Sequence, residues 1–164
     1  MASNFAKFMA KAEKHAVAGS TDLLATNGGR HIFNVKLTED MDNGCIIGIG
    51  DFKSMEYYEQ AAAGTFTAKI IGKASNGNFY VQVETVDDKT VLVLQNPLTY
   101  EEYTSKLKEE SQFYNEKGDI VRCYGLAPMD VFEVSAEAFT ADNTPEVTKE
   151  LSVDTSTHKL KVAE

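Results

Sequence analysis

The sequence contains no tryptophan, only three prolines and only two cysteines in 164 residues. The lack of tryptophan weakens the case for an aromatic carbohydrate-binding platform. Cys45 and Cys123 stand alone, without a Cys-x-x-Cys or Cys/His cluster, so no zinc site is expected. We expect both to be reduced thiols in the core, with a disulfide between neighbouring strands as the alternative.

Long apolar segments are also missing. No run approaches the roughly 20 residues that a membrane-spanning helix needs. The N-terminus has lysines but no continuous apolar stretch of the kind found in secretory signals, so we expect a chain made in the cytoplasm.

Common catalytic motifs are absent. The three histidines, His15, His31 and His158, are far apart in the sequence, and there is no Gly-x-Ser-x-Gly or phosphate-binding loop. The glycines at 44, 48 and 50 do not match the dinucleotide fingerprint. Pairs of adjacent acids can be explained by solvation, although a carboxylate pair formed only in the fold stays open. We expect no enzyme and no cofactor.

An acidic segment spans residues 39–44. Its oxygen ligands suit calcium, but the spacing of a calcium-binding EF-hand is missing, so a solvated turn is favoured over a metal site.

Charge is distributed unevenly along the chain. The net charge is −9, yet residues 1–30 hold four basic and two acidic side chains. The acidic remainder argues against nucleic-acid binding, which needs a basic face. The basic N-terminus suits an acidic protein partner.

The first 18 residues predict an amphipathic helix. Alanine, lysine, methionine and glutamate favour helices, and apolar residues recur at helical spacing. A helix this short needs something to pack on, which is a partner, its own body or a membrane surface, in that order of preference. A flexible connector is expected at residues 21–30. We interpret residues 1–30 as an arm whose candidate partner-binding residues are Phe5, Lys7, Phe8, Met9, Lys11 and Lys14.

Residues 31–164 predict a mainly β domain, as an antiparallel barrel or sandwich. Strands are expected at 31–37 and 45–49, with a short helical turn at 54–60. Residues 65–95 predict a three-stranded meander whose first turn is Asn76-Gly77, the strongest hairpin signal in the chain. A capping box at Thr99 and Glu102 predicts one short helix over 99–112 that crosses the domain. Residues 147–153 and 158–162 predict a closing hairpin.

The segment 115–139 predicts two strands joined by a corner. A turn at Glu116-Lys117-Gly118 leads into a strand at 120–124, and Pro128 interrupts the chain before a second strand begins at Val131. Alternation places Phe132 and Val134 on a dry face and Glu133 on a wet face.

This segment, together with 100–103, 113–114, 160–162 and the weaker pattern at 37–52, resembles small structural proteins of tailed bacteriophages that decorate the head. The resemblance covers roughly residues 37–52 and 96–162 and lies in strands and turns. It implies a virion protein on the capsid surface that binds the major capsid protein and associates with itself there, for example as a trimer. The acidic body and the short apolar runs lead us to expect no direct nucleic-acid partner and no membrane partner.

Two alternatives remain open at this stage. Small β-barrels also serve as head–tail or tail components. A carbohydrate- or cell-surface-binding module is the other, with Tyr57, Tyr58 and Tyr80 as candidate exposed aromatics.

Overall fold

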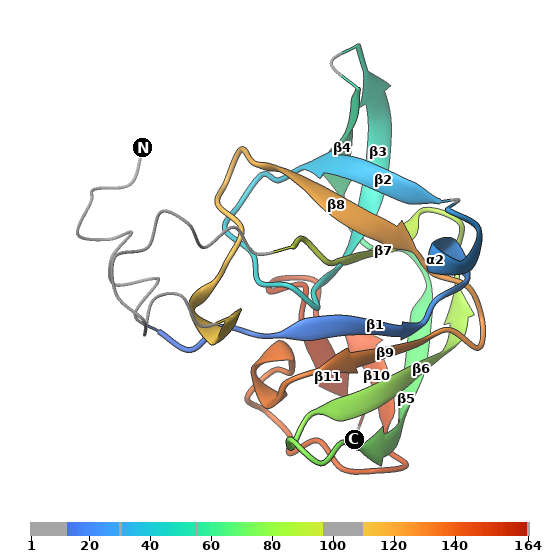
Figure 1. The fold of residues 1–164 in the computed structure, drawn as a ribbon, viewed down its shortest axis with the longest axis vertical. Helices are drawn as coiled ribbons and strands as arrows, with labels where there is room; N and C mark the ends of the chain where they lie inside the picture. Colours follow the sequence, from blue (N-terminus) through green and yellow to red (C-terminus); the bar gives the residue numbers. More distant parts are fainter. Residues whose placement is uncertain (1–12, 30, 55, 97–109, 164) are drawn as a thin grey trace.

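The protein is mainly β, as predicted. The computed structural model describes residues 13–29, 31–54, 56–96 and 110–163. Within them the strands form two units, a closed five-stranded barrel and a six-stranded sheet (Figure 1). The barrel confirms one of the two predicted architectures, and the sheet beside it was not anticipated.

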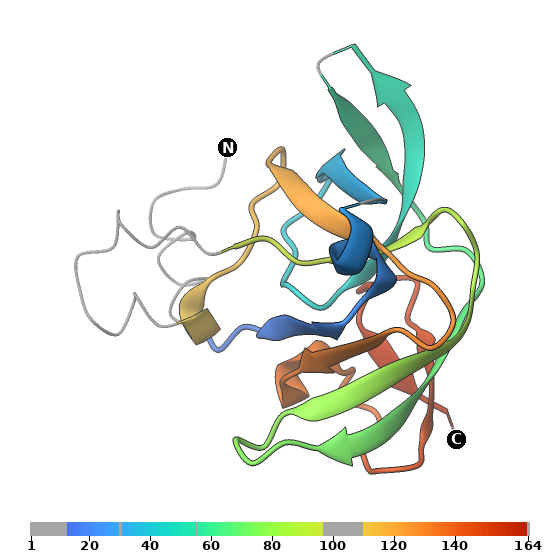
Figure 2. The same ribbon diagram turned by 45° about the vertical axis from the view of Figure 1, so that its right-hand side comes forward.

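The barrel has the strand order β2-β4-β3-β7-β8. Pairing is antiparallel except between β2 and β4, which run parallel with Val35 opposite Tyr58. The β3–β4 hairpin extends away from the rest of the molecule in both views (Figures 1 and 2). The barrel strands are β2 (Ile32–Lys36), β3 (Ile46–Lys53), β4 (Tyr57–Ala61), β7 (Thr90–Val93) and β8 (Ile120–Gly125).

The sheet has the order β1-β9-β6-β5-β10-β11, and every pairing in it is antiparallel. Its strands are β1 (Ala18–Asp22), β5 (Phe66–Lys73), β6 (Phe79–Val86), β9 (Val131–Val134), β10 (Glu150–Val153) and β11 (Leu160–Val162).

Two apolar cores follow from this arrangement. Ile47, Val91 and Val93 point into the barrel, whereas Ile46 and Leu92, one residue along, belong to the core shared with the sheet. Because successive side chains of a strand face opposite sides, β7 and the first part of β3 (residues 46–48) are buried on both faces. This explains why those residues are almost continuously apolar.

The predicted corner between residues 120 and 134 is confirmed. β8 lies in the barrel and β9 in the sheet, so the chain changes unit between them. Phe132 and Val134 are fully buried, as the alternation predicted. Asp130 fixes the corner, since its carboxylate accepts hydrogen bonds from the backbone N–H groups of Leu24 (3.0 Å) and Ala127 (2.8 Å).

The predicted meander is confirmed only in its first hairpin. β5 and β6 pair across a turn in which Gly77 has a φ of 91°. β7 instead leaves the sheet and pairs with β3 and β8 of the barrel. The closing hairpin is also confirmed, as β10 and β11.

The N-terminal region corrects two predictions. Residues 14–17 are not helical, and Ala18 begins β1, which pairs with β9 in the sheet. The expected flexible connector contains a short helix, α2 (Leu24–Gly28), and Leu23 and Ala25 are buried. The pairing of Ala18 with Val134 joins positions more than a hundred residues apart, which helix propensity alone does not reveal. Residues 1–12 lie outside the described part of the chain.

Two further helical predictions differ in outcome. The helical turn expected at 54–60 is wrong, because Tyr57 and Tyr58 begin β4, where aromatic side chains fit a pleated surface. The helix expected at 99–112 falls mainly outside the described residues. Its last part is a 3-10 turn, η2 (Glu110–Gln112), and a second such turn is η3 (Ala136–Ala138).

Candidate functional site

The acidic segment before β3 ties together three distant parts of the chain. Asp42 accepts hydrogen bonds from His15 Nδ1 (2.6 Å) and from the backbone N–H of Ala16 (3.0 Å). Glu39 accepts one from His158 Nε2 (2.8 Å). Asp40 accepts one from the backbone N–H of Lys117 (2.8 Å).

The predicted solvated turn holds for Glu39, whose side chain is 47% exposed, and for the exposed Asp40, but it is wrong for Asp42. The Asp42 side chain is only 13% exposed, and its oxygens receive protein donors. Among the described residues, no group of three or more histidine, cysteine, aspartate and glutamate side chains could hold a metal ion. The two histidines that bond to this segment come from opposite ends of the chain. No local sequence pattern could therefore have predicted that they pair with Asp42 and Glu39.

The N-terminal stretch is held to the body at several points. Val17 and Ser135 exchange two hydrogen bonds, one from the Val17 N–H to Ser135 Oγ (3.0 Å) and one from the Ser135 N–H to the Val17 carbonyl (2.8 Å). His15 also donates its backbone N–H to the Ser111 carbonyl (2.7 Å) and stacks on Tyr114. These contacts hold residues 15–17 against the body.

Of the six residues predicted to bind a partner, Lys14 alone is described. Its Nζ lies 2.7 Å from Glu137 Oε1 while its side chain remains 69% exposed. Burial by itself would raise the pKa of Glu137, but hydrogen bonds from Lys14 and Ser135 hold that pKa below its usual value. The other five residues, Phe5, Lys7, Phe8, Met9 and Lys11, lie outside the described residues.

The three candidate tyrosines do not form one surface. Tyr58 belongs to the barrel core and makes edge contacts with Phe33 and Phe52, at ring-centroid distances of 5.4 and 5.2 Å. Its neighbour Tyr57 faces the other side of β4, where Lys36 Nζ lies 5.5 Å from the ring centroid. Tyr80 lies on β6, in the other unit. All three are half-buried rather than exposed.

A groove lies beside Tyr57, between the end of β2 with the residues that follow it, β4, and the turn before β8. Its volume is about 650 Å³, within the range of roughly 300–1,000 Å³ that is usual for small-molecule sites. The polar side chains that line it are Lys36, Thr38, Glu59, Gln60 and Lys117.

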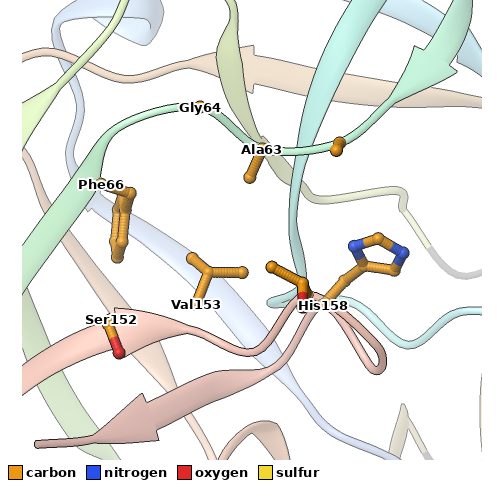
Figure 3. Close-up of a pocket in the computed structure, with 8 residues that line it drawn as sticks. Ala63, Gly64, Phe66, Ser152, Val153 and His158 are labelled. Atoms are coloured by element: carbon orange, nitrogen blue, oxygen red, sulfur yellow. The ribbon is translucent and has the colours of Figure 1, made fainter.

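A smaller pocket of about 140 Å³ lies between the connection from β4 to β5 and the β10–β11 hairpin. Figure 3 shows it between the Ala63–Phe66 segment and the β10–β11 hairpin, with the His158 ring at one end. His158 Nδ1 is buried and has no hydrogen-bond partner.

The two cysteines are buried and free, which confirms the prediction of reduced core thiols. Both contribute to the barrel core. Desolvation, followed by the nearby Asp42 charge, raises the pKa of Cys45 to about 12, and desolvation also raises the pKa of Cys123. Neither thiol is therefore activated as a nucleophile at neutral pH.

No described helix has the length and apolar content needed to cross a membrane. Comparisons of the chain with protein-family models, with curated proteins and with solved structures find no match.

Proposed function

We propose that this is a non-enzymatic structural protein of a tailed-bacteriophage virion that binds the outside of the assembled capsid and stabilises it. The proposal starts from the resemblance of the strand-and-turn pattern to phage decoration proteins. The structural observation that best supports it is the anchoring of the N-terminal stretch to the body.

That anchoring gives residues 1–12 a fixed point of departure. Lys14 pairs with Glu137, His15 pairs with Asp42, and β1 continues the attachment into the sheet. A basic, apolar N-terminal sequence joined in this way would tether a rigid β body to an acidic patch on the major capsid protein. Stabilisation would then follow from mass action, because a ligand that binds only the assembled shell favours that shell.

The chemistry of the described residues supports a non-enzymatic role. Both thiols are buried with raised pKa values. His15 Nδ1 and His158 Nε2 each pair with a carboxylate. Described hydroxyls of Thr90, Ser156 and Thr157 donate to the carboxylates of Asp87 and Asp154, but the pKa of each carboxylate is lowered, which makes it a weak base for activating a nucleophile.

Exposed apolar side chains offer contacts for neighbouring copies or for the shell. The largest exposures belong to Met129 (70%), Leu24 (62%) and Phe52 (58%). Repeated contacts between copies on the shell would let weak single sites act together, which is consistent with self-association on the capsid.

The test is co-sedimentation of the purified protein with phage heads that lack it, beside free, unassembled capsid protein. Saturable binding to heads but not to free subunits would support the proposal. Binding to neither would favour a tail or head–tail component, and the protein would then be sought in fractionated virions.

The part played by the arm is tested by deleting residues 1–12. A longer deletion to residue 20 would remove Ala16 and Ala18 from the core and would damage the fold itself. Loss of head binding by the shorter deletion, with an unchanged melting temperature, would support the arm. Full binding by this variant would assign capsid recognition to the body instead.

A further inference from the structure

We propose that the groove beside Tyr57 binds a neutral saccharide, with Tyr57 as the surface on which the sugar ring stacks. This activity would be additional to capsid binding and does not depend on it. The argument rests on the rigidity of the groove, on the kinds of side chain that line it, and on the charge around it.

The floor of the groove is rigid. The backbone of Leu37 exchanges two hydrogen bonds of 2.9 Å with the turn before β8, donating to the Asp119 carbonyl and accepting from the Gly118 N–H. One residue on, the Thr38 N–H donates to Gln60 Oε1 (2.9 Å). The groove is thus formed before any ligand arrives, which lowers the entropic cost of binding.

The lining offers one apolar face among polar groups. Leu37 is buried, so the Tyr57 ring is the main apolar surface in the groove. Lys36 Nζ lies over this ring, 5.5 Å from its centroid. A hexopyranose has the same mixed character, with a face of C–H groups for an aromatic ring and hydroxyls around its edge that need partners.

Partners for those hydroxyls surround Tyr57. Glu59 supplies acceptors and the lysine ammonium groups supply donors. Within the described residues, Lys36 and Lys117 form no ion pair with a carboxylate, so both ammonium groups remain able to donate to a ligand. Glu59 pairs with Lys53 through Oε1 at 3.3 Å, and its side chain is 52% exposed.

Charge selects a neutral ligand over an acidic one. Glu39 and Asp40 bond to residues that line the groove, and Asp119 belongs to the adjoining turn. Together with Glu59 these four carboxylates outnumber the three lysines, Lys36, Lys117 and the Lys53 that pairs with Glu59, in a protein whose net charge is −9. An anionic sugar would be repelled, whereas a neutral one would not.

The experiment is native gel electrophoresis of the full chain in gels that contain a soluble polysaccharide. The probes are a β-glucan, a mannan and a galactan, with polygalacturonate as the acidic comparison. We expect retardation by at least one neutral polysaccharide. Retardation by none of them, or by polygalacturonate alone, would overturn the proposal.

Substitutions locate the binding. Tyr57→Ala should weaken binding at least about fivefold, whereas Tyr57→Phe, which keeps the ring, should lose much less. Tyr80→Ala is the matched control, because that tyrosine is also half-buried but lies on the other unit. Equal losses in the Tyr57 and Tyr80 variants, or unchanged binding by Tyr57→Ala, would count against the site.

Lys117→Ala provides a second route if Tyr57→Ala fails to fold. Its side chain has no ion-pair partner among the described residues, so removing it should leave the melting temperature unchanged while weakening retardation. Unchanged retardation by a folded Lys117→Ala protein would contradict the assigned role of that ammonium group. Because no capsid is present in these gels, their outcome is independent of the head-binding test.

Discussion

Gly48 of β3 and Ala62, the residue that follows β4, lie in direct backbone contact. A Cβ atom added to Gly48 would come within 2.9 Å of the Ala62 carbonyl carbon and would collide with the carbonyl oxygen. Gly48 pairs with Ala61 of β4 on one side and with Thr90 of β7 on the other. The glycine therefore lets the chain leaving β4 pass directly over β3.

Gly48→Ala should destabilise the protein. The clash is with backbone rather than with the end of a flexible side chain, so the cost should lie near the upper end of the roughly 1–3 kcal/mol seen for overpacked sites. Gly28→Ala is the control, since a Cβ atom there meets nothing within 4 Å. Urea denaturation of both variants would measure the free energies of unfolding, and equal values would contradict the assigned contact.

Two substitutions in the acidic segment should lower the free energy of unfolding by different amounts. Asp42→Ala removes the partner of His15 and of the Ala16 N–H at a mostly buried position, and should cost about 2–3 kcal/mol. Glu39→Ala should cost less, about 1 kcal/mol or below, because that side chain is 47% exposed and solvent screens its bond to His158.

The same denaturation experiment distinguishes these losses from a general charge effect. Glu146→Ala removes an exposed carboxylate that makes no side-chain bond among those described, and should change stability by no more than about 0.5 kcal/mol. A larger loss for Glu39→Ala than for Asp42→Ala would contradict the assigned burial of the two carboxylates.

Local pattern predicted the elements whose partners are near in sequence. The Asn76-Gly77 turn encoded the β5–β6 hairpin, and alternation encoded the buried face of Phe132 and Val134. Those signals depend on neighbouring residues only. The sequence therefore supported a mainly β fold with a barrel.

Partners far apart in sequence could not be predicted in the same way. β7 was expected to continue the meander, yet it is buried on both faces between β3 and β8 of the barrel. Its apolar sequence is equally compatible with a strand of the meander and with a strand of the barrel, so the pattern could not distinguish the two. The groove was likewise hidden, because Tyr57 and Lys117 are brought together only by closure of the barrel. Tyr57 was a candidate from its residue type alone.

The buried thiols predict slow chemistry in the native state. Desolvation raises the pKa of Cys45 to about 12 and also raises that of Cys123, so the thiolate fraction at neutral pH is very small. Reaction with a disulfide reagent such as dithiobis(nitrobenzoate) should be at least about 100-fold slower in buffer than in denaturant. Both thiols should become reactive together when the protein unfolds. Rapid labelling of either thiol in the native protein would contradict the prediction, because it would show that this thiol is accessible to the reagent.

The turn between β10 and β11 predicts a pH-dependent contribution to stability. Hydrogen bonds from Thr157 and then Ser156 lower the pKa of Asp154 from 3.8 to about 2. Since the folded pKa is the lower one, this contribution is fully present above about pH 4 and is lost as the pH falls towards 2. Asp154→Asn should therefore melt below the wild type at pH 7, and the difference should shrink as the pH falls below 4. Melting curves at pH 7, 4 and 2.5 would check this, and a difference that stayed constant would exclude the carboxylate as its cause.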